Sequence, residues 1–276
     1  MSASIAYPEF VGLFERYNLS IWPLQLVGHL AGLIVLVLML IRWKHSQTAV
    51  FAFLAVFWVF IGVVFHFMYL GSLYLPERTF AVLWGAQSAL FAFSAIRSSG
   101  FLTRSTEWYA ILGWLAIGYS LIGYPVLGFL LRGSVLRIAW FGGFPCPMAL
   151  FTLAILVLAE GPLPKWLLIV PGFWAVGGLI PFLWGIREDL GLIILGVLIV
   201  GSIVVRDRRK RPKGQPVDVA ARKPLPHSIE HHAAGRTAMQ TPNSGENIPH
   251  GQFPRKSAGI GKRKSSCEVR LSAMGP

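Results

Sequence analysis

Two histidines, His29 and His66, lie inside long apolar runs of this sequence. Each belongs to a group of polar, aromatic or small residues spaced by three and four, which places the group on one face of a helix. The two groups are Asn18, Trp22, Gln25 and His29, and Trp58, Gly62, His66 and Tyr69. An imidazole titrates near physiological pH and is a common metal ligand, so two such faces that met would form a proton relay or a ligand site. The alternative is two separate structural histidines, each hydrogen-bonded to a backbone carbonyl or a tyrosine.

A second candidate is Cys146, which stands between Pro145 and Pro147 after the Gly-rich segment 141–144. Two prolines remove two backbone donors, so we expect a helix break here that leaves carbonyl groups free. In lipid, such a break is tolerated where it is buried in protein or lines a polar cavity. A thiol becomes a nucleophile or soft-metal ligand when its thiolate is stabilised, and no sequence neighbour of Cys146 does this. A packing role for Cys146 is therefore the alternative.

The later apolar runs carry polar residues that are predicted to connect helices. Glu188 and Asp189 precede the last run, where carboxylates favour a helix N-terminus. Contact with a substrate or a cation at the membrane rim is the alternative for this acidic pair. Tyr124 is expected to hydrogen-bond a neighbouring helix or a solute in a cavity. The remaining interhelical candidates are Gln87, Ser88 and Tyr119.

The sequence contains none of the short motifs that would indicate an enzyme class. It has no HExxH, no histidine box, no G-x-S-x-G, no phosphate-binding loop and no paired aspartates of a membrane protease or lipid phosphatase. Zinc would require three or four protein ligands, and Cys146 and Cys267 are too far apart for a paired metal spacing or a disulfide framework. We therefore expect no metal, no cofactor and no catalytic residue.

The composition is that of a membrane protein with a basic tail. The chain is 54% hydrophobic and 13% charged, whereas soluble domains have about 25% charged residues. Residues 206–276 contain 15 of the 25 Lys and Arg but 5 of the 12 Asp and Glu, a net charge of +10. The high pI therefore belongs to this tail and does not indicate nucleic-acid binding. The tail has few large apolar residues and is predicted to be disordered.

Seven apolar runs approach the roughly 20 residues that cross a bilayer. We expect transmembrane helices at about 22–42, 49–72, 79–96, 108–131, 145–160, 166–184 and 188–205, after an amphipathic interfacial helix within 1–20. Tryptophans near the ends of these runs are typical of an aromatic belt. They are Trp22, Trp43, Trp108, Trp140, Trp166 and Trp184.

The basic residues of segment 206–213 follow the last run and predict a cytoplasmic C-terminus. With seven spans, the N-terminus then lies outside the cell. Arg132 and Arg137 do not fit this orientation, because it places them on an outer connection. The run from Arg206 to Lys213 is also a candidate for contact with anionic lipid, and a plain stop-transfer cluster is the alternative.

Several short motifs together resemble a family of bacterial multi-pass integral membrane proteins of unknown function, over about residues 8–205. The motifs are Phe14-Glu-Arg-Tyr-Asn18 with Trp22-Pro-Leu-Gln25, Gly62-Val-Val-Phe-His66, Phe141-Gly-Gly-Phe-Pro-Cys-Pro147 with Phe151-Thr-Leu153, Pro171 with Trp174, and Glu188-Asp-Leu190. The Pro-Cys-Pro segment followed by Phe-Thr is the most specific of them. The resemblance implies a membrane topology and no particular activity.

The sequence thus predicts an all-α, polytopic membrane helix bundle in a bacterial inner membrane, with a helical domain at 1–205 and a disordered tail at 206–276. The leading hypothesis is a small transporter or permease-like protein in which His29 or His66 takes and gives a proton. Its polar cavity would contain Gln25, His29, His66, Tyr124 and Cys146. The alternatives are a non-catalytic membrane subunit that docks partner proteins, and a membrane enzyme that uses Cys146. The identity of the solute or partner is not encoded in any motif.

Overall fold

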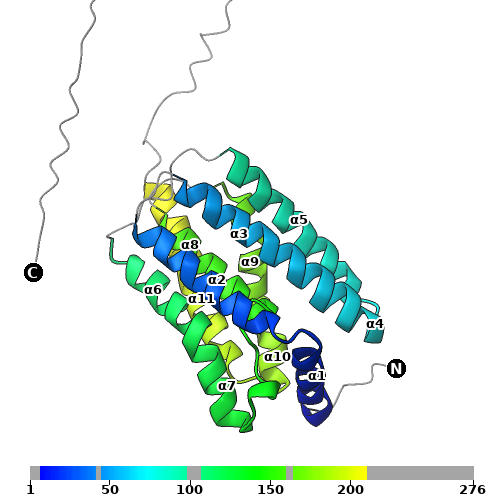
Figure 1. Ribbon diagram of the computed structural model, residues 1–276. Coiled ribbons are helices and arrows are strands. Elements are labelled where there is room, and N and C mark those ends of the chain that lie inside the picture. Colours follow the sequence, from blue (N-terminus) through cyan, green and yellow to red (C-terminus); the bar gives the residue numbers. More distant parts are fainter. Residues whose placement is uncertain (1–6, 42–44, 98–106, 160–163, 210–276) are drawn as a thin grey trace, which may run out of the picture. The chain divides into compact units, whose positions relative to one another are not determined.

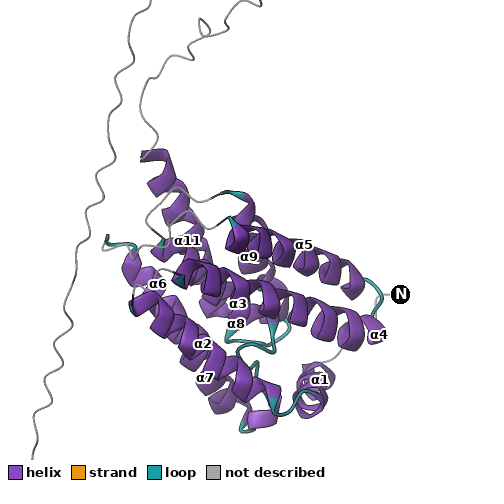
Figure 2. Cartoon of the chain, turned by 45° about the horizontal axis from the view of Figure 1, so that its top comes forward, coloured by secondary structure: helices purple, strands orange, loops and turns teal. Residues whose placement is uncertain are grey.

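The computed structural model describes residues 7–41, 45–97, 107–159 and 164–209, and these residues belong to one compact unit. Figures 1 and 2 show helices joined by short connections, with no strand drawn in these ranges. Residues 206–209 of the predicted tail belong to the last helix, Asp189–Arg209, so the predicted disorder is wrong there. For residues 210–276, outside the described ranges, it stays a prediction.

The helices follow one another in the order that the apolar runs predict. The first half contains α1 (Tyr7–Ser20), α2 (Leu24–Leu40), α3 (Ser46–Phe60), the π-helical segment η1 (Ile61–Leu70), α4 (Gly71–Leu73) and α5 (Glu77–Ile96). The second half contains α6 (Ala110–Gly118), the π-helical segment η2 (Tyr119–Gly123), α7 (Tyr124–Arg132), the 3-10 turn η3 (Val135–Arg137), α8 (Pro145–Leu158), α9 (Trp166–Gly177), α10 (Leu179–Leu183) and α11 (Asp189–Arg209).

Within the described ranges, five helices are long and apolar enough to cross a membrane: Ser46–Leu73, Glu77–Ile96, Ala110–Arg132, Trp166–Leu183 and Asp189–Arg208. A sixth span results if α1 and α2 count as one, although the two meet at 82°. The predicted number of seven also includes α2 alone, with 17 residues, and α8, with 14, which are short for a bilayer. The helices themselves were predicted correctly, and their number of crossings stays a prediction.

The outer surface of the bundle is apolar. On α2, large aliphatic side chains that are each more than half exposed form a continuous stripe: Leu26, Leu30, Leu33, Ile34 and Val37. A protein in water rarely exposes apolar surface on this scale, because the cost of hydrating it is high. The stripe therefore indicates a protein embedded in a membrane.

Helix α8 is the centre of the bundle. Of its 14 residues, all but Cys146 are buried, and α3, α6, α9 and α11 pack around it. Pro145 and Pro147 are the first and third residues of α8, where the missing N–H groups have no intrahelical partner in any case. The predicted break in the helical backbone therefore lies just before α8, and the two prolines begin the helix that was predicted at 145–160.

The non-helical backbone lies just before α8, and it is buried against α2. Gly142 has a left-handed φ of +78°. A Cβ on Gly28 would lie 2.9 Å from the carbonyl oxygen of Phe141 and 3.1 Å from the Cα of Gly142. Glycine at position 28 thus allows helix and loop backbones to touch.

Helix α1 packs its apolar face on the protein, and its predicted position at the membrane interface stays a prediction. The ring of Phe14 lies 4.7 Å from that of Phe144, and the Tyr17 hydroxyl donates a hydrogen bond to the carbonyl of Gly143 (3.0 Å). The hydroxyl of Tyr69 donates to the carbonyl of Leu13 (2.9 Å). Aromatic partners within the bundle thus bury the apolar face of α1. In Figure 1, α1 lies with α4, α7 and α10 at the end of the bundle away from the last turns of α11.

Candidate functional site

A cavity of about 370 Å³ lies at the α1 end of the bundle. It is lined mainly by aromatic side chains of α1, η1, α5, α9 and the connections beside them. These side chains are Phe10, Phe14, Phe65, Tyr74, Phe80, Phe144, Phe173, Trp174 and Trp184. The ionisable residues in its lining are His66, Glu77, Cys146 and Asp189. Small-molecule sites have this character, with an apolar wall and few polar groups.

His66 and Glu77 form one polar side of the cavity. His66 is 2% exposed, and its Nδ1 lies 2.8 Å from Oε2 of Glu77, the first residue of α5. The imidazole also packs against Trp84 and Trp174, with ring centroids 5.5 and 5.2 Å away. Its Nε2 is buried and has no hydrogen-bond partner. A buried ring nitrogen without a partner is costly, which makes it a candidate ligand-binding atom.

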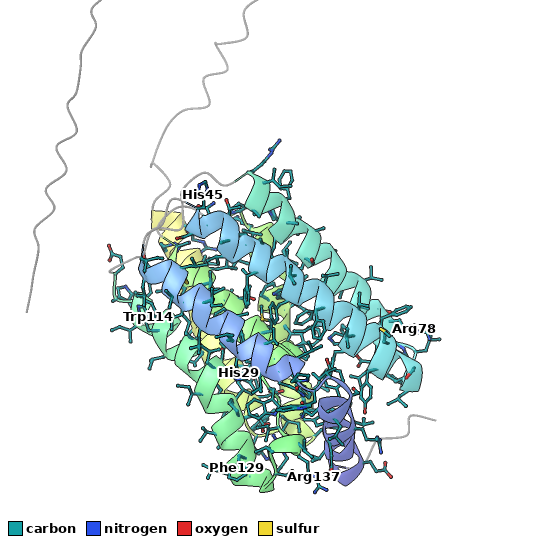
Figure 3. The ribbon with its side chains drawn as sticks, viewed as in Figure 1. His29, His45, Arg78, Trp114, Phe129 and Arg137 are labelled. Atoms are coloured by element: carbon teal, nitrogen blue, oxygen red, sulfur yellow. The ribbon has the colours of Figure 1, made fainter. Side chains whose placement is uncertain are left out.

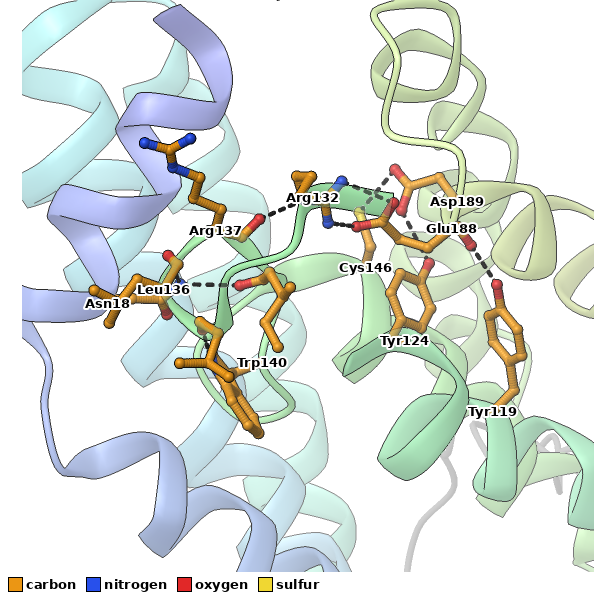
Figure 4. A network of polar contacts seen from close by, with 12 residues as sticks. Asn18, Tyr119, Tyr124, Arg132, Leu136, Arg137, Trp140, Cys146, Glu188 and Asp189 are labelled. Atoms are coloured by element: carbon orange, nitrogen blue, oxygen red, sulfur yellow. Dashed lines mark hydrogen bonds and ion pairs between the residues drawn. The ribbon is translucent and has the colours of Figure 1, made fainter. Parts of the chain in front are cut away.

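Asp189 and Cys146 form the other polar side. Asp189 begins α11 and is 1% exposed. Its Oδ1 accepts a hydrogen bond from the Tyr124 hydroxyl (3.0 Å), and its Oδ2 accepts one from the Cys146 thiol (3.4 Å), as Figure 4 shows. Both donors are neutral. The positive end of the α11 dipole also favours the carboxylate, but neither contact supplies a full positive charge.

The neighbouring residue, Glu188, is bound by an arginine. Nη1 of Arg132 lies 3.1 Å from Oε2 of Glu188, and Nη2 contacts Oε1, so the contact is bidentate (Figure 4). The Glu188 side chain is 0% exposed. The Tyr119 hydroxyl donates to the Glu188 backbone carbonyl (2.7 Å). Glu188 and Asp189 are therefore buried members of a hydrogen-bonded network at the start of α11, and their contact with a substrate or a cation stays a prediction.

The two arginines that did not fit the predicted orientation are both paired with acids. Arg132 binds Glu188, and Nε of Arg137 lies 2.8 Å from Oε2 of Glu15 on α1, beside which Figure 3 shows Arg137. Each pair is formally neutral. The positive-inside rule counts Lys and Arg whether or not an acid lies beside them, so the two arginines still do not fit the predicted orientation.

The structure separates the residues that the sequence grouped into one cavity. His66 and Cys146 line the cavity, and Tyr124 reaches it through Asp189. Gln25 and His29 are absent from its lining.

Gln25 and His29, which both lie on α2, have hydrogen-bond partners outside the cavity. Nε2 of Gln25 donates to the carbonyl of Asn18 (2.6 Å), and Nδ1 of His29 lies 3.0 Å from the carbonyl of Gln25. His29, labelled on α2 in Figure 3, packs against Trp140 and Phe141. The two histidines thus have different partners, and the predicted pairing of His29 with His66 is not among the contacts of either.

The predicted interhelical hydrogen bonds of three further residues are present. Ser88 donates to the carbonyl of Ala55 (2.7 Å), and Nε2 of Gln87 donates to the carbonyl of Leu167 (3.4 Å). Tyr119 bonds to the start of α11, as described above. These bonds join α5 to α3 and α9, and η2 to α11.

Sequence reasoning missed two partners, Glu77 for His66 and Arg132 for Glu188. Arg78, the sequence neighbour of Glu77, donates its Nε–H to the carbonyl of Gly71 (3.1 Å). The order of the predicted helices could have indicated these pairs, because it places all of these residues at one end of the bundle.

The first residue of the predicted lipid-binding run has a different environment. Arg206 is buried, and its Nη1 donates to the carbonyls of Val157 (3.3 Å) and Ala159 (2.5 Å) at the end of α8. A cation at this position is favoured by the negative end of the α8 dipole at the helix C-terminus. Residues 210–213 of the run lie outside the described residues.

Within the described ranges, no group of three His, Cys, Asp or Glu is placed to hold a metal ion. The fold and the site together define an all-helical protein with an apolar exterior and a buried, ionisable cavity. Residues 8–213 match DUF6064, a family of unknown function, and the chain belongs to this family. No curated protein and no solved structure matches the chain. The family relationship supplies no activity, so function has to be argued from the cavity.

Proposed function

We propose that this protein is a transporter of a bacterial inner membrane that binds a small solute in the cavity and carries it across the bilayer. The observation that carries the proposal is the placement of two buried polar groups, His66–Glu77 and Cys146–Asp189, in the wall of one aromatic cavity. Ionisable groups inside a membrane protein are expensive, and those retained usually face a solute or proton pathway.

The proposed topology has seven crossings, with α8 as a short central span. Because α8 is surrounded by α3, α6, α9 and α11, its 14 residues need not match the lipid thickness. The basic residues that follow α11 favour a cytoplasmic C-terminus. The cavity then lies at the outer end, and the buried side chains of α8 close the path to the cytoplasm.

The two π-helical segments support a moving part. His66 lies in η1, and η2 ends immediately before Tyr124, which contacts Asp189. π-Helical turns are rare, and they occur frequently at functional sites. In the proposed cycle, a rearrangement at η1 and η2 opens the cavity toward the inside. His66, oriented by Glu77, takes and gives the coupled proton.

The test is solute flux in liposomes that contain the purified full-length protein and an internal pH-sensitive dye. Amines, amino acids, sugars and carboxylates are added outside in turn, and a proton-coupled carrier changes the internal pH for its own solute class. His66→Ala is expected to abolish this change. His29→Ala is the matched control, because His29 does not line the cavity, and it is expected to retain the change.

A folded, reconstituted wild-type protein that moves none of these solutes would overturn the proposal. It would favour the alternative function, a non-catalytic membrane subunit that docks partner proteins. Loss of flux in His29→Ala to the same extent as in His66→Ala would remove the cavity from the mechanism.

A further inference from the structure

We infer that the solute is a small organic cation that carries an apolar group, such as a protonated arylalkylamine. The inference rests on the proposed function in one respect, namely that the cavity binds a solute. It adds the chemical class of that solute, which follows from the charges, the rings and one unpartnered atom in the cavity wall.

The charged residues of the cavity wall select for a cation. Glu77 and Asp189 are the carboxylates of the lining, and no lysine or arginine belongs to it. The guanidinium of Arg132 is bound to both oxygens of Glu188. The hydrogen-bond donors to Asp189 are a hydroxyl and a thiol, and neither carries a full positive charge. A bound cation would supply the missing charge, and an anion would be repelled.

The aromatic lining favours a cation with an apolar group over an inorganic ion. Phe65, Phe80, Phe144 and Trp174 surround the histidine side of the cavity. The face of an aromatic ring carries partial negative charge and attracts an ammonium group, most strongly where water is excluded. The same rings bury the apolar part of the solute. A cavity of about 370 Å³ holds a molecule of this kind, and the site has too few oxygen ligands for a bare metal ion.

His66 supplies the acceptor that a primary or secondary ammonium needs. Its Nδ1 lies against Glu77, so in the neutral ring the Nδ1 proton is donated to the carboxylate and Nε2 is left as an acceptor. Nε2 is buried and has no hydrogen-bond partner among the described residues. An N–H of the ammonium would satisfy it. This acceptor points to the same ligand class as the two carboxylates.

The experiment measures binding of three probes with the same phenyl ring to the full-length protein in detergent. The probes are 2-phenylethylammonium, 2-phenylethanol and 3-phenylpropionate, which are positive, neutral and negative at pH 7.5. Binding is followed by tryptophan fluorescence, since Trp174 and Trp184 line the cavity, and by the shift in thermal unfolding. The cation is expected to bind at least about tenfold more tightly than the alcohol.

Asp189→Asn is expected to lower the affinity for the cation about tenfold or more and to change that for the alcohol less than twofold. Glu15→Gln is the matched control. Glu15 pairs with Arg137 outside the cavity lining, so the affinity should be unchanged. If Asp189→Asn does not fold, Glu77→Gln carries the same test, because Glu77 is more exposed.

Equal or tighter binding of the alcohol or the carboxylate would overturn the cation assignment and leave the proposed solute site in place. The same conclusion follows if Asp189→Asn and Glu77→Gln both keep the full affinity for the cation. If none of the three probes binds the folded protein, both the cation assignment and the solute cavity are overturned.

Discussion

Glu188 and Asp189 are adjacent, both are buried, and they sit in opposite electrostatic environments. Glu188 is held by both terminal nitrogens of Arg132. Asp189 faces the cavity and is held by the Tyr124 hydroxyl and the Cys146 thiol. One carboxylate therefore has its counter-ion within the protein, and the other has only neutral donors.

The difference separates a polar group that stabilises the fold from one that is available for binding. Removing one partner of a buried ion pair strongly destabilises the fold, because the other charge is left buried and unpaired. Asp189 begins a helix, whose positive end favours a carboxylate, and it lines the cavity, where a bound cation would contact it. Substitutions in the Arg132–Glu188 pair should therefore change mainly the free energy of unfolding, and substitutions at Asp189 or its donors should change ligand binding.

The largest effect is expected for Arg132→Met. Glu188 then stays buried without a counter-ion, which should lower the free energy of unfolding by about 3–5 kcal/mol. The double variant Arg132→Met/Glu188→Leu removes both charges and should recover most of this loss. Unfolding in detergent, followed by circular dichroism, measures both. A single variant as stable as the double variant would show that this pair does not hold the fold.

Gly191→Ala should have the next largest effect. A Cβ at position 191 would lie 2.2 Å from the Tyr119 ring, so this ring must move and its hydrogen bond to the Glu188 carbonyl is lost. Overpacking of this kind costs about 1–3 kcal/mol. Gly201→Ala, on the same helix, is the control, since no atom lies within 4 Å of its added Cβ. The same unfolding measurement should show Gly201→Ala to be neutral or slightly stabilising, and equal losses in both variants would contradict the assignment.

The two tyrosines donate to adjacent residues, Tyr119 to the backbone carbonyl of Glu188 and Tyr124 to the side chain of Asp189. Tyr119→Phe removes a hydrogen bond worth about 0.5–1.5 kcal/mol, and Tyr124→Phe removes one worth about 1.5–3 kcal/mol where the acceptor is charged. Tyr124→Phe leaves Asp189 with fewer donors, so a bound cation should compensate more. We expect the thermal shift produced by 2-phenylethylammonium to be larger in Tyr124→Phe than in the wild type. Tyr119→Phe should show the wild-type shift, and an equal increase in both variants would break the comparison.

The helices were predictable from sequence because apolar length and Pro or Gly boundaries are local properties. The predicted range 79–96 became α5 at Glu77–Ile96, and the range 166–184 became α9 and α10, ending at Leu183. The range 145–160 became α8, which begins at Pro145. A proline breaks a helix in its interior and is tolerated in its first turn, so Pro145 and Pro147 mark the start of this helix.

The site was only partly predictable, because its pairs are distant in sequence. His66, Cys146 and Asp189 were singled out as polar residues in apolar surroundings, which is a local signal. Their partners were not, since Arg132 is 56 residues from Glu188 and reaches it only because α7 and α11 meet at one end of the bundle. His29 gave the same local signal as His66, yet its contacts are within α2 and with the segment before α8.

The smallest effect is expected for Cys146→Ala. A thiol is a weak donor, and the distance of 3.4 Å from Sγ to Oδ2 of Asp189 is long, so the loss in unfolding free energy should stay below about 1 kcal/mol. Cys146→Ser offers a stronger donor and should be at least as stable as Cys146→Ala. Both are measured by unfolding in detergent, in a Cys267→Ser background that leaves one thiol. A loss as large as that of Tyr124→Phe would make the thiol a main partner of Asp189, and the carboxylate would then be less available to a cation than its contacts suggest.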